Sequence, residues 1–329
     1  MKIIVIGCGS IGQRHLRNLV SLGENNFIAV DLDDKRLENL KKQIKSLKTY
    51  ANLDEALKSE TPIDAAFVCT PSSLHIPLAA KLAKTKINLF LEKPLSDTLK
   101  GIKEVEILVK KNNLITMMGM NYRFQPGLIK IKELLDKKTI GNILLINSFG
   151  GHYLPDWHPK MDYRQEYAAQ KKLGGGVLLT SIHGLDYLRW LAGEPKWVFG
   201  HIDKISNLNI DTDDISFAFF ETTNGIKVEY HTDFLQRISE HRLTIIGSEG
   251  TITWKFAENK VNYFTTKSDK WNKINYKFEI NDMYINELKY FLKSVKHKTQ
   301  TSLGIDEGIK TLQFALKIKK SSKSKRIEF

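Results

Sequence analysis

The first 120 residues alternate short β-rich runs with helix-length amphipathic runs, and this rhythm constrains the fold more than any other feature of the chain. The β-rich runs are Ile3–Ile6, Phe27–Val30, Ala65–Cys69, Asn88–Leu91 and Ile115–Met118. Strands that alternate with helices in this way predict a parallel sheet with crossover helices on its faces. The first part of the chain is therefore expected to be an α/β domain with a doubly wound parallel sheet.

After about residue 140 the rhythm changes to strand-length runs separated by turn signals. These runs are Ile143–Ser148, Ile215–Phe220, Ile226–His231, Leu243–Ile246 and Thr251–Trp254, with Thr223-Asn224-Gly225 and Ser248-Glu249-Gly250 between two of the pairs. Such spacing predicts a mainly antiparallel sheet. Helices are expected at about 177–192, 282–296 and 305–320. The sequence thus predicts two domains, residues 1–121 and an α+β domain of residues 122–329 with a large open sheet.

A G-x-G-x-x-G motif, Gly7-Cys8-Gly9-Ser10-Ile11-Gly12, stands between the first strand and the first helix. The glycines allow a tight turn and a close approach of the backbone to a pyrophosphate at a helix N-terminus. Asp31 ends the second strand, where a carboxylate accepts hydrogen bonds from the adenosine ribose and repels a 2′-phosphate. This context predicts a Rossmann domain that binds NAD, with NADP less favoured.

Polar residues follow the later strands of the first domain. In an open parallel sheet ligands bind beyond the carboxyl ends of the strands, so these residues are candidates for one site. They are Thr70, Pro71, Ser72 and His75; Glu92, Lys93 and Pro94; and Asn121, Tyr122 and Arg123. Each could instead be a solvated loop residue, and His75 could simply start a helix.

The chain resembles the Gfo/Idh/MocA oxidoreductases, named for glucose-fructose oxidoreductase and inositol dehydrogenase. The resemblance covers essentially the whole length. It rests on Gly7–Gly12, Thr70-Pro71 with His75, Glu92-Lys93-Pro94, Asn121-Tyr122-Arg123, Gly174-Gly175-Gly176 with His183 and Asp186, and Glu307-Gly308. It implies an NAD-dependent dehydrogenase for a sugar, amino sugar, nucleotide sugar or cyclitol, with Lys93 beside the nicotinamide and the substrate hydroxyl. The resemblance also implies a homodimer or homotetramer.

The helix expected after Gly176 carries the candidate general base. At 100° per residue, Leu178, Ile182, Leu185, Leu188 and Ala192 share an apolar stripe, and Thr180, His183 and Tyr187 fall on the opposite face. With the resemblance, His183 is the expected base. Asp186 lies one turn on and could fix the imidazole tautomer or make a surface or cap interaction. Many relatives have an aspartate where this chain has Thr180, which puts a carboxylate–histidine pair in doubt.

The segment 151–164 is rich in aromatic and charged residues and is expected to form a loop. The loop could cover a sugar, or it could merely pack on the sheet. The residues expected to bind the cofactor are Gly7, Gly9, Ser10, Ile11, Gly12, Asp31, Thr70, Pro71, His75, Glu92, Lys93 and Asn121. The residues expected to bind the substrate are Lys93, Tyr122, Arg123, Trp157, Tyr163, Arg164, Thr180 and His183. Of these, Lys93 and His183 are expected to be catalytic.

Composition limits the remaining functions. The net charge is +13, but the lysines are spread along the chain and densest only at 317–326, so nucleic acid is not an expected partner. The excess lysines could simply form a solvated surface, or they could attract an anionic substrate. The chain has two cysteines, no membrane-length apolar run and no His-Glu-x-x-His spacing, so a cytoplasmic enzyme without a metal is expected. A dinucleotide-sensing protein that has lost the chemistry is the main alternative.

Overall fold

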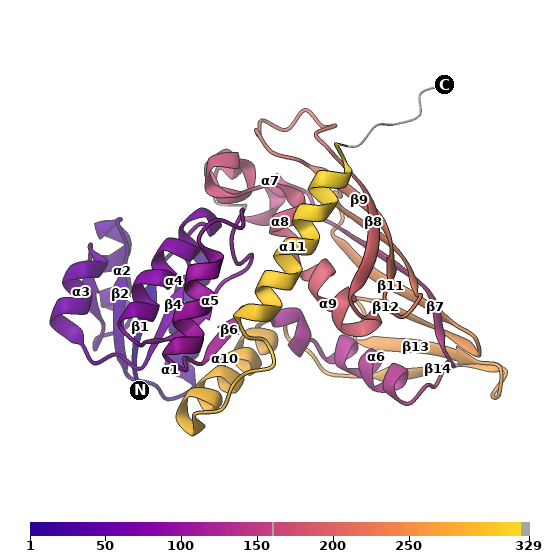
Figure 1. The fold of residues 1–329 in the computed structure, drawn as a ribbon, viewed down its shortest axis with the longest axis horizontal. Helices are drawn as coiled ribbons and strands as arrows, with labels where there is room; N and C mark the ends of the chain where they lie inside the picture. Colours follow the sequence, from indigo (N-terminus) through magenta and orange to yellow (C-terminus); the bar gives the residue numbers. More distant parts are fainter. Residues whose placement is uncertain (160, 324–329) are drawn as a thin grey trace. The chain divides into compact units, whose positions relative to one another are not determined.

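The computed structural model describes residues 1–159 and 161–323, and its chain forms two compact units (Figure 1). The first unit comprises Met1–Asn121 and Ile280–Lys310, and the second comprises Tyr122–Glu279 and the chain from Thr311 onward. The segment 280–310 is expected in the second domain from its position in the sequence, whereas in the structure it belongs to the first unit. The last residues of the lysine-rich run, from 324 on, lie outside the described residues.

The first unit contains a six-stranded parallel sheet, which confirms the predicted doubly wound fold. Its strands are β1 (Lys2–Ile6), β2 (Asn26–Val30), β3 (Lys48–Tyr50), β4 (Ala65–Val68), β5 (Asn88–Leu91) and β6 (Thr116–Met118), in the order β3-β2-β1-β4-β5-β6. The crossover helices are α1 (Ser10–Ser21), α2 (Asp34–Gln43), α3 (Leu53–Glu60), α4 (His75–Lys84) and α5 (Ile102–Lys111). Strand β3 was missed from the sequence because Lys48-Thr49-Tyr50 is not an apolar run and is not buried in the structure.

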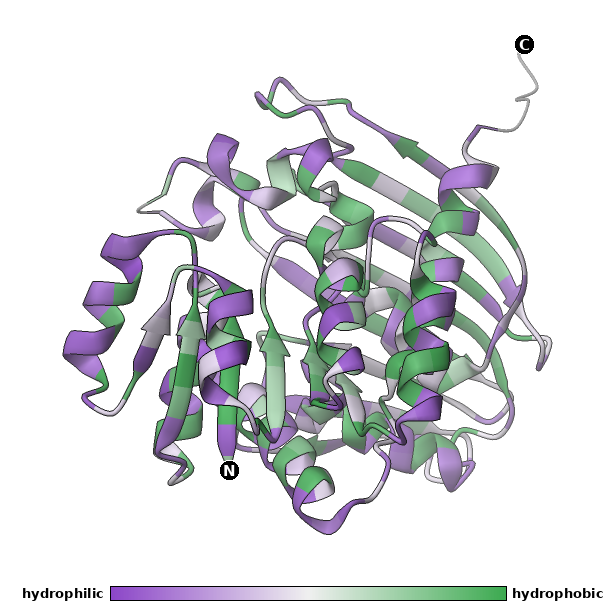
Figure 2. Cartoon of the chain, turned by 60° about the vertical axis from the view of Figure 1, so that its left-hand side comes forward, coloured by the Kyte–Doolittle hydropathy of each residue, from purple (hydrophilic) through white to green (hydrophobic). Residues whose placement is uncertain are grey.

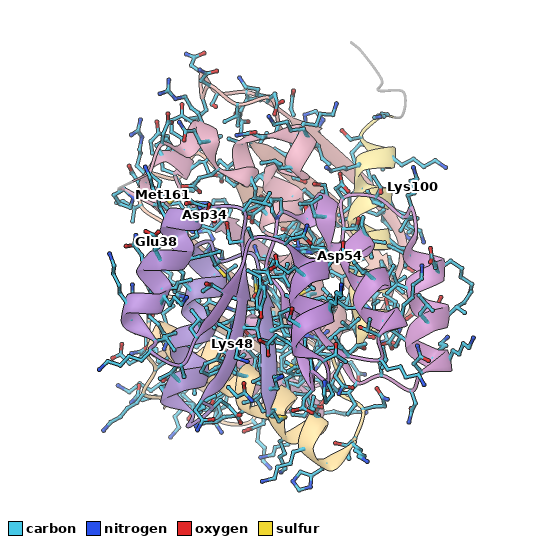
Figure 3. The ribbon with its side chains drawn as sticks, turned by 90° about the vertical axis from the view of Figure 1, so that its left-hand side faces the viewer. Asp34, Glu38, Lys48, Asp54, Lys100 and Met161 are labelled. Carbon is cyan, nitrogen blue, oxygen red and sulfur yellow. The ribbon has the colours of Figure 1, made fainter. Side chains whose placement is uncertain are left out.

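The central strands form the core of this unit because both faces of the sheet are covered. Ile3, Ile4 and Val5 are fully buried, and the whole of β4 is buried as well. Strands buried on two faces read as continuous apolar runs, which is why they can be found from the sequence. Figure 2 shows the hydrophobic colour in these strands and the hydrophilic colour on the outer faces of the helices. On α2, Asp34 and Glu38 are exposed (Figure 3).

Helix α10 (Ile280–His297) joins the first unit from far along the chain. Asn281 and Asn18 of α1 exchange side-chain hydrogen bonds of 2.9 and 3.2 Å. Phe291 packs edge-on against Phe67 of β4 and Phe90 of β5, with ring centroids 5.6 and 5.5 Å apart. The apolar stripe of α10 therefore closes one face of the parallel sheet near α1.

The second unit is built on an eight-stranded sheet that is mostly antiparallel, as predicted. Its strands are β7 (Ile143–Gly151), β8 (Pro195–Asp203), β9 (Ile215–Thr222), β10 (Lys227–Asp233), β11 (Glu240–Gly247), β12 (Gly250–Lys255), β13 (Lys260–Thr265) and β14 (Lys270–Asn275), in the order β14-β13-β12-β11-β7-β10-β9-β8. Strands β7 and β10 pair in parallel. Strands β8, β13 and β14 were missed from the sequence, since β8 and β14 are edge strands and β13 and β14 are rich in lysine and asparagine.

One face of this sheet is covered by α6 (Pro126–Asp136), α8 (Val177–Thr180), α9 (His183–Ala192) and the second part of α11 (Ile305–Ser321). Phe314 of α11 packs edge-on against Phe220 of β9, with ring centroids 4.9 Å apart. On the opposite face, side chains of the outer strands β8 and β9 are exposed: Trp197, Phe199, Phe217 and Phe219. Exposed aromatic groups on one sheet face are typical of an interaction surface.

The expectation of one continuous helix over about 177–192 was wrong. Helix α8 ends at Thr180, and Ser181, with φ −95° and ψ 24°, leaves the helical conformation before α9 begins at His183. The Ser181 carbonyl accepts hydrogen bonds from the Gly184 amide and from the hydroxyl of Tyr230 on β10. The Tyr230 hydroxyl thus stabilises the break between α8 and α9. Residues on the two sides of the break do not share one helix, so the helix faces assigned at 100° per residue do not extend across it.

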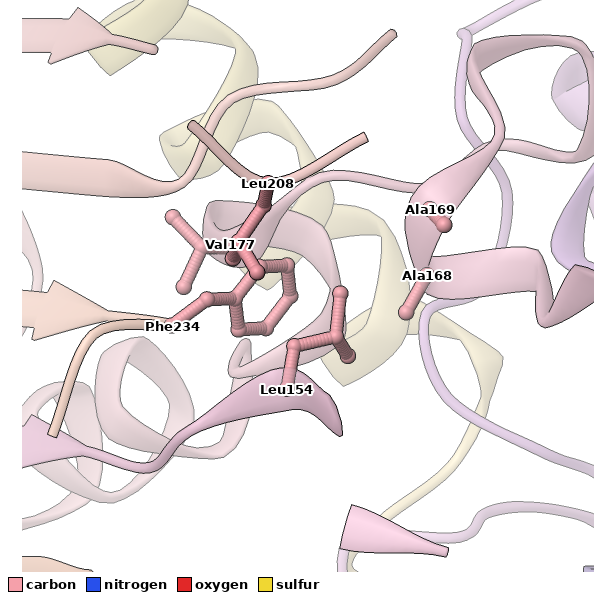
Figure 4. Close-up of a cluster of buried hydrophobic side chains, with 6 residues drawn as sticks. All are labelled: Leu154, Ala168, Ala169, Val177, Leu208 and Phe234. Atoms are coloured by element: carbon pink, nitrogen blue, oxygen red, sulfur yellow. The ribbon is translucent and has the colours of Figure 1, made fainter. Parts of the chain in front are cut away.

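The segment between β7 and α8 packs into a hydrophobic cluster that also takes residues from α8, from the loop between β8 and β9, and from the chain after β10. The cluster contains Leu154, Ala168, Ala169, Val177, Leu208 and Phe234 (Figure 4). The rings of Tyr153 and Tyr163 pack against this cluster. Among the described residues, no helix is both long and apolar enough to cross a membrane.

Candidate functional site

The turn between β1 and α1 has the geometry that its glycines predict. Gly7 has φ +85°, and a Cβ on it would lie 2.8 Å from the backbone of Cys69 and Thr70. A Cβ on Gly12 would lie 2.0 Å from the Gly7 carbonyl oxygen. A Cβ on Gly9, in contrast, would meet no atom within 4 Å. Packing therefore requires the outer two glycines, and the space over Gly9 suits a pyrophosphate that approaches the start of α1.

Asp31 lies at the end of β2 and is tied to this turn. Its Oδ2 accepts a hydrogen bond of 2.6 Å from the Cys8 amide. Burial of Cys8 and the nearby Asp31 carboxylate raise the pKa of the Cys8 thiol to about 12. Cys8 is therefore a protonated packing residue, and it presents its backbone amide to the carboxylate at the ribose end of the site.

Two buried oxygens at the carboxyl edge of the sheet lack hydrogen-bond partners among the described residues. They are Thr70 Oγ1, after β4, and Asn121 Oδ1, after β6. A buried polar atom without a partner is costly, so its presence points to a ligand or a water that satisfies it. These two side chains, with the glycine turn, fit a dinucleotide that lies along the carboxyl edge.

His75 is the first residue of α4, as in the helix-start alternative. Its side chain is buried, with Nδ1 2.8 Å from the Pro94 carbonyl oxygen and Nε2 2.8 Å from that of Thr70. Burial lowers the pKa of His75. Because both ring nitrogens contact carbonyl groups of the protein, the geometry favours His75 as a residue that holds the loops after β4 and β5.

Glu92, Lys93 and Pro94 follow β5, and Glu92 anchors them from inside the unit. Glu92 Oε1 lies 2.7 Å from His15 Nε2 of α1, and Oε2 accepts a hydrogen bond from the Lys93 amide. Burial alone would raise the pKa of Glu92, but the His15 hydrogen bond and the Lys93 charge lower it below its ordinary value. Glu92 is thus an internal anion that fixes the start of the loop, and Lys93 itself is half-buried.

Glu287 of α10 completes a buried group with His15 and Glu92. Potential ligand atoms of the three side chains lie within 4.8 Å of one another. Neither carboxyl oxygen of Glu287 has a hydrogen-bond partner among the described residues. Burial and the Glu92 charge raise the pKa of Glu287 well above its ordinary value. The raised pKa favours the neutral form of Glu287 beside the Glu92 carboxylate, and the expectation of no catalytic metal stays a prediction.

In the second unit, Tyr122 and His183 form an aromatic stack. Their ring centroids lie 4.9 Å apart with an interplanar angle of 21°. Tyr187, one turn after His183 on α9, stacks on the same tyrosine with centroids 6.1 Å apart. His241 of β11 borders the stack, and burial lowers its pKa to about 4. The stack holds the His183 ring against Tyr122, and the neighbouring His241 is neutral near neutral pH.

The partner of Asp186 is Arg123, which none of the three alternatives considered for this aspartate included. The Arg123 Nε donates to Asp186 Oδ2 at 2.7 Å, and Nη2 donates to Oδ1 at 2.9 Å. Asp186 is fully buried and Arg123 nearly so. The guanidinium also lies over the Trp190 ring. This two-point ion pair links the 3-10 turn Asn121–Phe124 to α9, and so it supports the Tyr122–His183 stack.

The side chains of the segment 151–164 mainly contact other loop residues of the second unit. The Tyr163 hydroxyl accepts a hydrogen bond from the Asn209 amide, and Arg164 pairs with Asp162 on the surface. Trp157 is partly exposed and stacks on His158. These contacts favour the packed-loop alternative for Tyr163 and Arg164. Thr180, at the end of α8, is buried.

Comparison with known proteins identifies the family. Residues 1–120 match the profile described as the oxidoreductase family, NAD-binding Rossmann fold, and residues 128–253 match the Gfo/Idh/MocA C-terminal domain. The chain belongs to the Gfo/Idh/MocA oxidoreductase family. The expected resemblance is thereby confirmed, and the first unit is the NAD-binding Rossmann domain of this family.

Similar proteins include two inositol dehydrogenases. A myo-inositol 2-dehydrogenase of Thermotoga maritima is 28% identical, over 99% of this chain and 97% of its own. A scyllo-inositol 2-dehydrogenase (NAD(+)) of Bacillus subtilis is 26% identical, over 94% of this chain and 90% of its own. A levoglucosan dehydrogenase solved in complex with NADH has the same fold, with a TM-score of 0.87, 18% identity and coverage of 98% and 96%.

Sequence reasoning missed His15, Glu287 and Arg36 as residues near the site. His15 and Glu287 come together with Glu92 from α1, α10 and the end of β5, and no local spacing connects them. Arg36 lies on α2, where its guanidinium contacts Asp31. Its position on the helix that follows Asp31 was a signal that could have been used, because an arginine near this carboxylate is a known feature of dinucleotide sites.

Proposed function

We propose that this protein is an NAD-dependent dehydrogenase that oxidises a secondary alcohol of a sugar or cyclitol, or catalyses the reverse reduction. The observation that carries the proposal is the β1–α1 turn, in which Gly7 and Gly12 are required by packing and Gly9 faces open space. Membership of an oxidoreductase family with an NAD-binding domain supports it.

The dinucleotide would be held along the carboxyl edge of the parallel sheet. Gly7, Gly9, Ser10, Ile11 and Gly12 would bind the pyrophosphate at the start of α1. Asp31 would accept hydrogen bonds from the adenosine ribose and favour NAD over NADP. The Thr70 hydroxyl would donate or accept, and Asn121 Oδ1 would accept, at the nicotinamide end, since both buried oxygens lack a hydrogen-bond partner among the described residues. Pro71, His75 and Glu92 would shape this edge.

When bound, the nicotinamide ring supplies the hydride acceptor or donor. Oxidation of an alcohol also requires the hydroxyl proton to leave. We assign that proton to His183, because an imidazole is the side chain that most often serves as a general base in enzymes. Lys93 is assigned to the substrate oxygen, where an ammonium group stabilises developing negative charge. Both assignments come from the family resemblance.

The substrate class follows from what the relatives are named for, which are inositols and levoglucosan. All are polyhydroxylated rings, so we propose a sugar or cyclitol ring for this chain, with amino sugars and nucleotide sugars included. Tyr122, Trp157, Tyr163, Arg164 and Thr180 remain proposed contacts. For Arg123 we now propose a positioning role, because Asp186 binds its guanidinium at two points.

We also propose a homodimer or homotetramer that buries the outer face of the eight-stranded sheet. The support is the exposed set Trp197, Phe199, Phe217 and Phe219 on β8 and β9. A cytoplasmic location is proposed as well, since both cysteines are free and buried.

The test is a screen of purified protein with NAD against inositol isomers, levoglucosan, free sugars and nucleotide sugars, followed by NADH absorbance. We expect at least one polyhydroxylated ring to give NADH, and Lys93→Met to abolish the signal while NADH still binds. Tight NADH binding with no turnover on any compound of the panel would instead support a dinucleotide-sensing protein.

A further inference from the structure

His241 of β11 is a polar side chain that the proposed chemistry does not use. It lies two residues before the buried Leu243, so both side chains point to the face of the sheet that α8 and α9 cover. Its ring borders Tyr122 and Phe256, with ring centroids 5.9 and 6.0 Å away. Tyr122 in turn stacks on the proposed base His183. His241 therefore belongs to the same aromatic group as His183.

Neither ring nitrogen of His241 has a hydrogen-bond partner among residues 1–159 and 161–323. The carboxylates that act on the ring by their charge are those of Asp233 and Glu240. Asp233 already contacts the His231 ring and accepts hydrogen bonds from two backbone amides. Glu240 precedes His241 in the strand, so its side chain points to the opposite face. The half-buried imidazole is thus left for water or for a ligand.

The charge state of His241 suits a hydroxyl partner. Burial lowers its pKa from the ordinary value of 6.5 to about 4, against the opposing effect of the two carboxylates. The imidazole is therefore neutral near neutral pH, with one nitrogen that donates and one that accepts. A hydroxyl group also donates and accepts, so it can bind either nitrogen. An imidazolium ion could only donate.

The end of β7 leaves the Nδ1 edge of His241 clear of side chains. Gly150 pairs with His241 across the two strands, and a Cβ on Gly150 would lie 3.2 Å from Nδ1. Gly151 follows, so two successive residues of β7 present only backbone at this end. Sites for small molecules typically combine aromatic walls with a few placed polar groups. The rings of Tyr122 and Phe256 and the unpaired imidazole form such a combination.

We propose that His241 binds a hydroxyl group of the ring substrate next to Tyr122, and so helps to determine which polyhydroxylated ring this chain accepts. The inference rests on the proposed function, because it deepens the substrate site of that reaction. The hydroxyl donates to one nitrogen or accepts from the other, while ring carbons pack on Tyr122 and Phe256. A ring without a hydroxyl at this position leaves the imidazole unpaired, which disfavours that ring.

The experiment measures how the full-length protein binds and turns over inositol isomers, levoglucosan and free sugars. Ring binding is titrated in the presence of NADH by saturation-transfer NMR, and turnover is measured with NAD. His241→Phe keeps an aromatic ring without nitrogen atoms, and His241→Asn keeps a donor and an acceptor. His201→Phe is the matched control, since His201 is a half-buried histidine on the opposite face of the same sheet.

We expect His241→Phe to weaken binding of the preferred ring and to raise its KM by roughly 10-fold, the loss of one hydrogen bond in a half-buried site. The order of preference among the rings should change as well, and His241→Asn should recover part of the loss. NADH binding should change by less than about threefold, and His201→Phe should change neither ligand's binding by more. Because His241 is neutral, the low-pH limb assigned to His183 should stay at its wild-type position.

Two kinds of result would overturn the inference. A ring affinity of His241→Phe within about twofold of the wild type, with the same order among the rings, would mean that His241 is only hydrated. Equal losses in His241→Phe and His201→Phe, or an equal loss of NADH binding, would indicate a general effect on the fold, which a thermal melt of each variant checks. A wild type that binds a ring without turning it over would contradict the proposed function alone. One that binds no ring would contradict both.

Discussion

The Arg123–Asp186 pair gives the sharpest stability prediction. Replacing Asp186 with Asn keeps the shape of the side chain but removes its charge and one of the two acceptors for Arg123. A hydrogen bond to a charged group contributes about 1.5–3 kcal/mol, and breaking a buried ion pair costs about 3–5 kcal/mol. Asp186 is fully buried, whereas Arg123 retains 11% exposure, so solvent relieves part of the loss. We expect the free energy of unfolding of the second unit to fall by about 3 kcal/mol.

The assay is urea unfolding of the wild type, Asp186→Asn, Arg123→Met and the double variant. The double variant should lose about 2 kcal/mol less than the sum of the two single changes, since each single change already breaks the same interaction. In Asp186→Asn the Tyr122–His183 stack also loses its support, so turnover should fall more than NADH binding. A loss below about 1 kcal/mol, or additivity within about 0.5 kcal/mol, would refute the ion-pair argument.

Three further predictions concern the proposed chemistry and its surroundings. Replacing His183 with Ala should slow alcohol oxidation by roughly 10² or more and remove the fall in rate at low pH, as a pH–rate profile would show; an unchanged low-pH limb would assign the base elsewhere, with Tyr122 or Tyr163 next. Asp31→Ser should narrow any preference for NAD over NADP in nucleotide titrations, and an unchanged ratio would remove Asp31 as the determinant. Because the pKa of Glu287 is raised in the folded state, its contribution to stability is complete below the ordinary pKa of 4.5 and is lost as pH rises toward the folded-state pKa. In urea unfolding, Glu287→Gln should therefore gain stability relative to the wild type as pH rises. Parallel pH curves for the two proteins would contradict a neutral Glu287.

The sequence was sufficient where local pattern and local geometry coincide. The buried strands of the first unit read as apolar runs, and Gly7 and Gly12 stand where close backbone packing excludes a side chain. The carboxyl ends of parallel strands share an edge, so the sequence alone could predict that Thr70, Glu92 and Asn121 lie at the same edge of the sheet.

Interactions between distant segments could not be predicted in this way. His15 and Glu287 stand near opposite ends of the chain and meet at Glu92 only because α10 packs on α1. The interruption before His183 depends on the Tyr230 hydroxyl from another element, and helical periodicity carries no sign of it. Helical spacing could relate Asp186 only to nearby residues such as His183, whereas its partner Arg123 precedes it by 63 residues.

The central claim is hydride transfer between a polyhydroxylated ring and NAD, and deuterium transfer tests it most directly. Purified protein is incubated with NAD and carbon-deuterated inositol isomers or levoglucosan, and the reduced nucleotide is analysed by mass spectrometry. The account predicts deuterated NADH from the wild type and roughly a hundredth as much or less from His183→Ala or Lys93→Met over the same period, although both variants still bind NADH. A wild type that binds NADH and yields no deuterated nucleotide from any of these rings would contradict it.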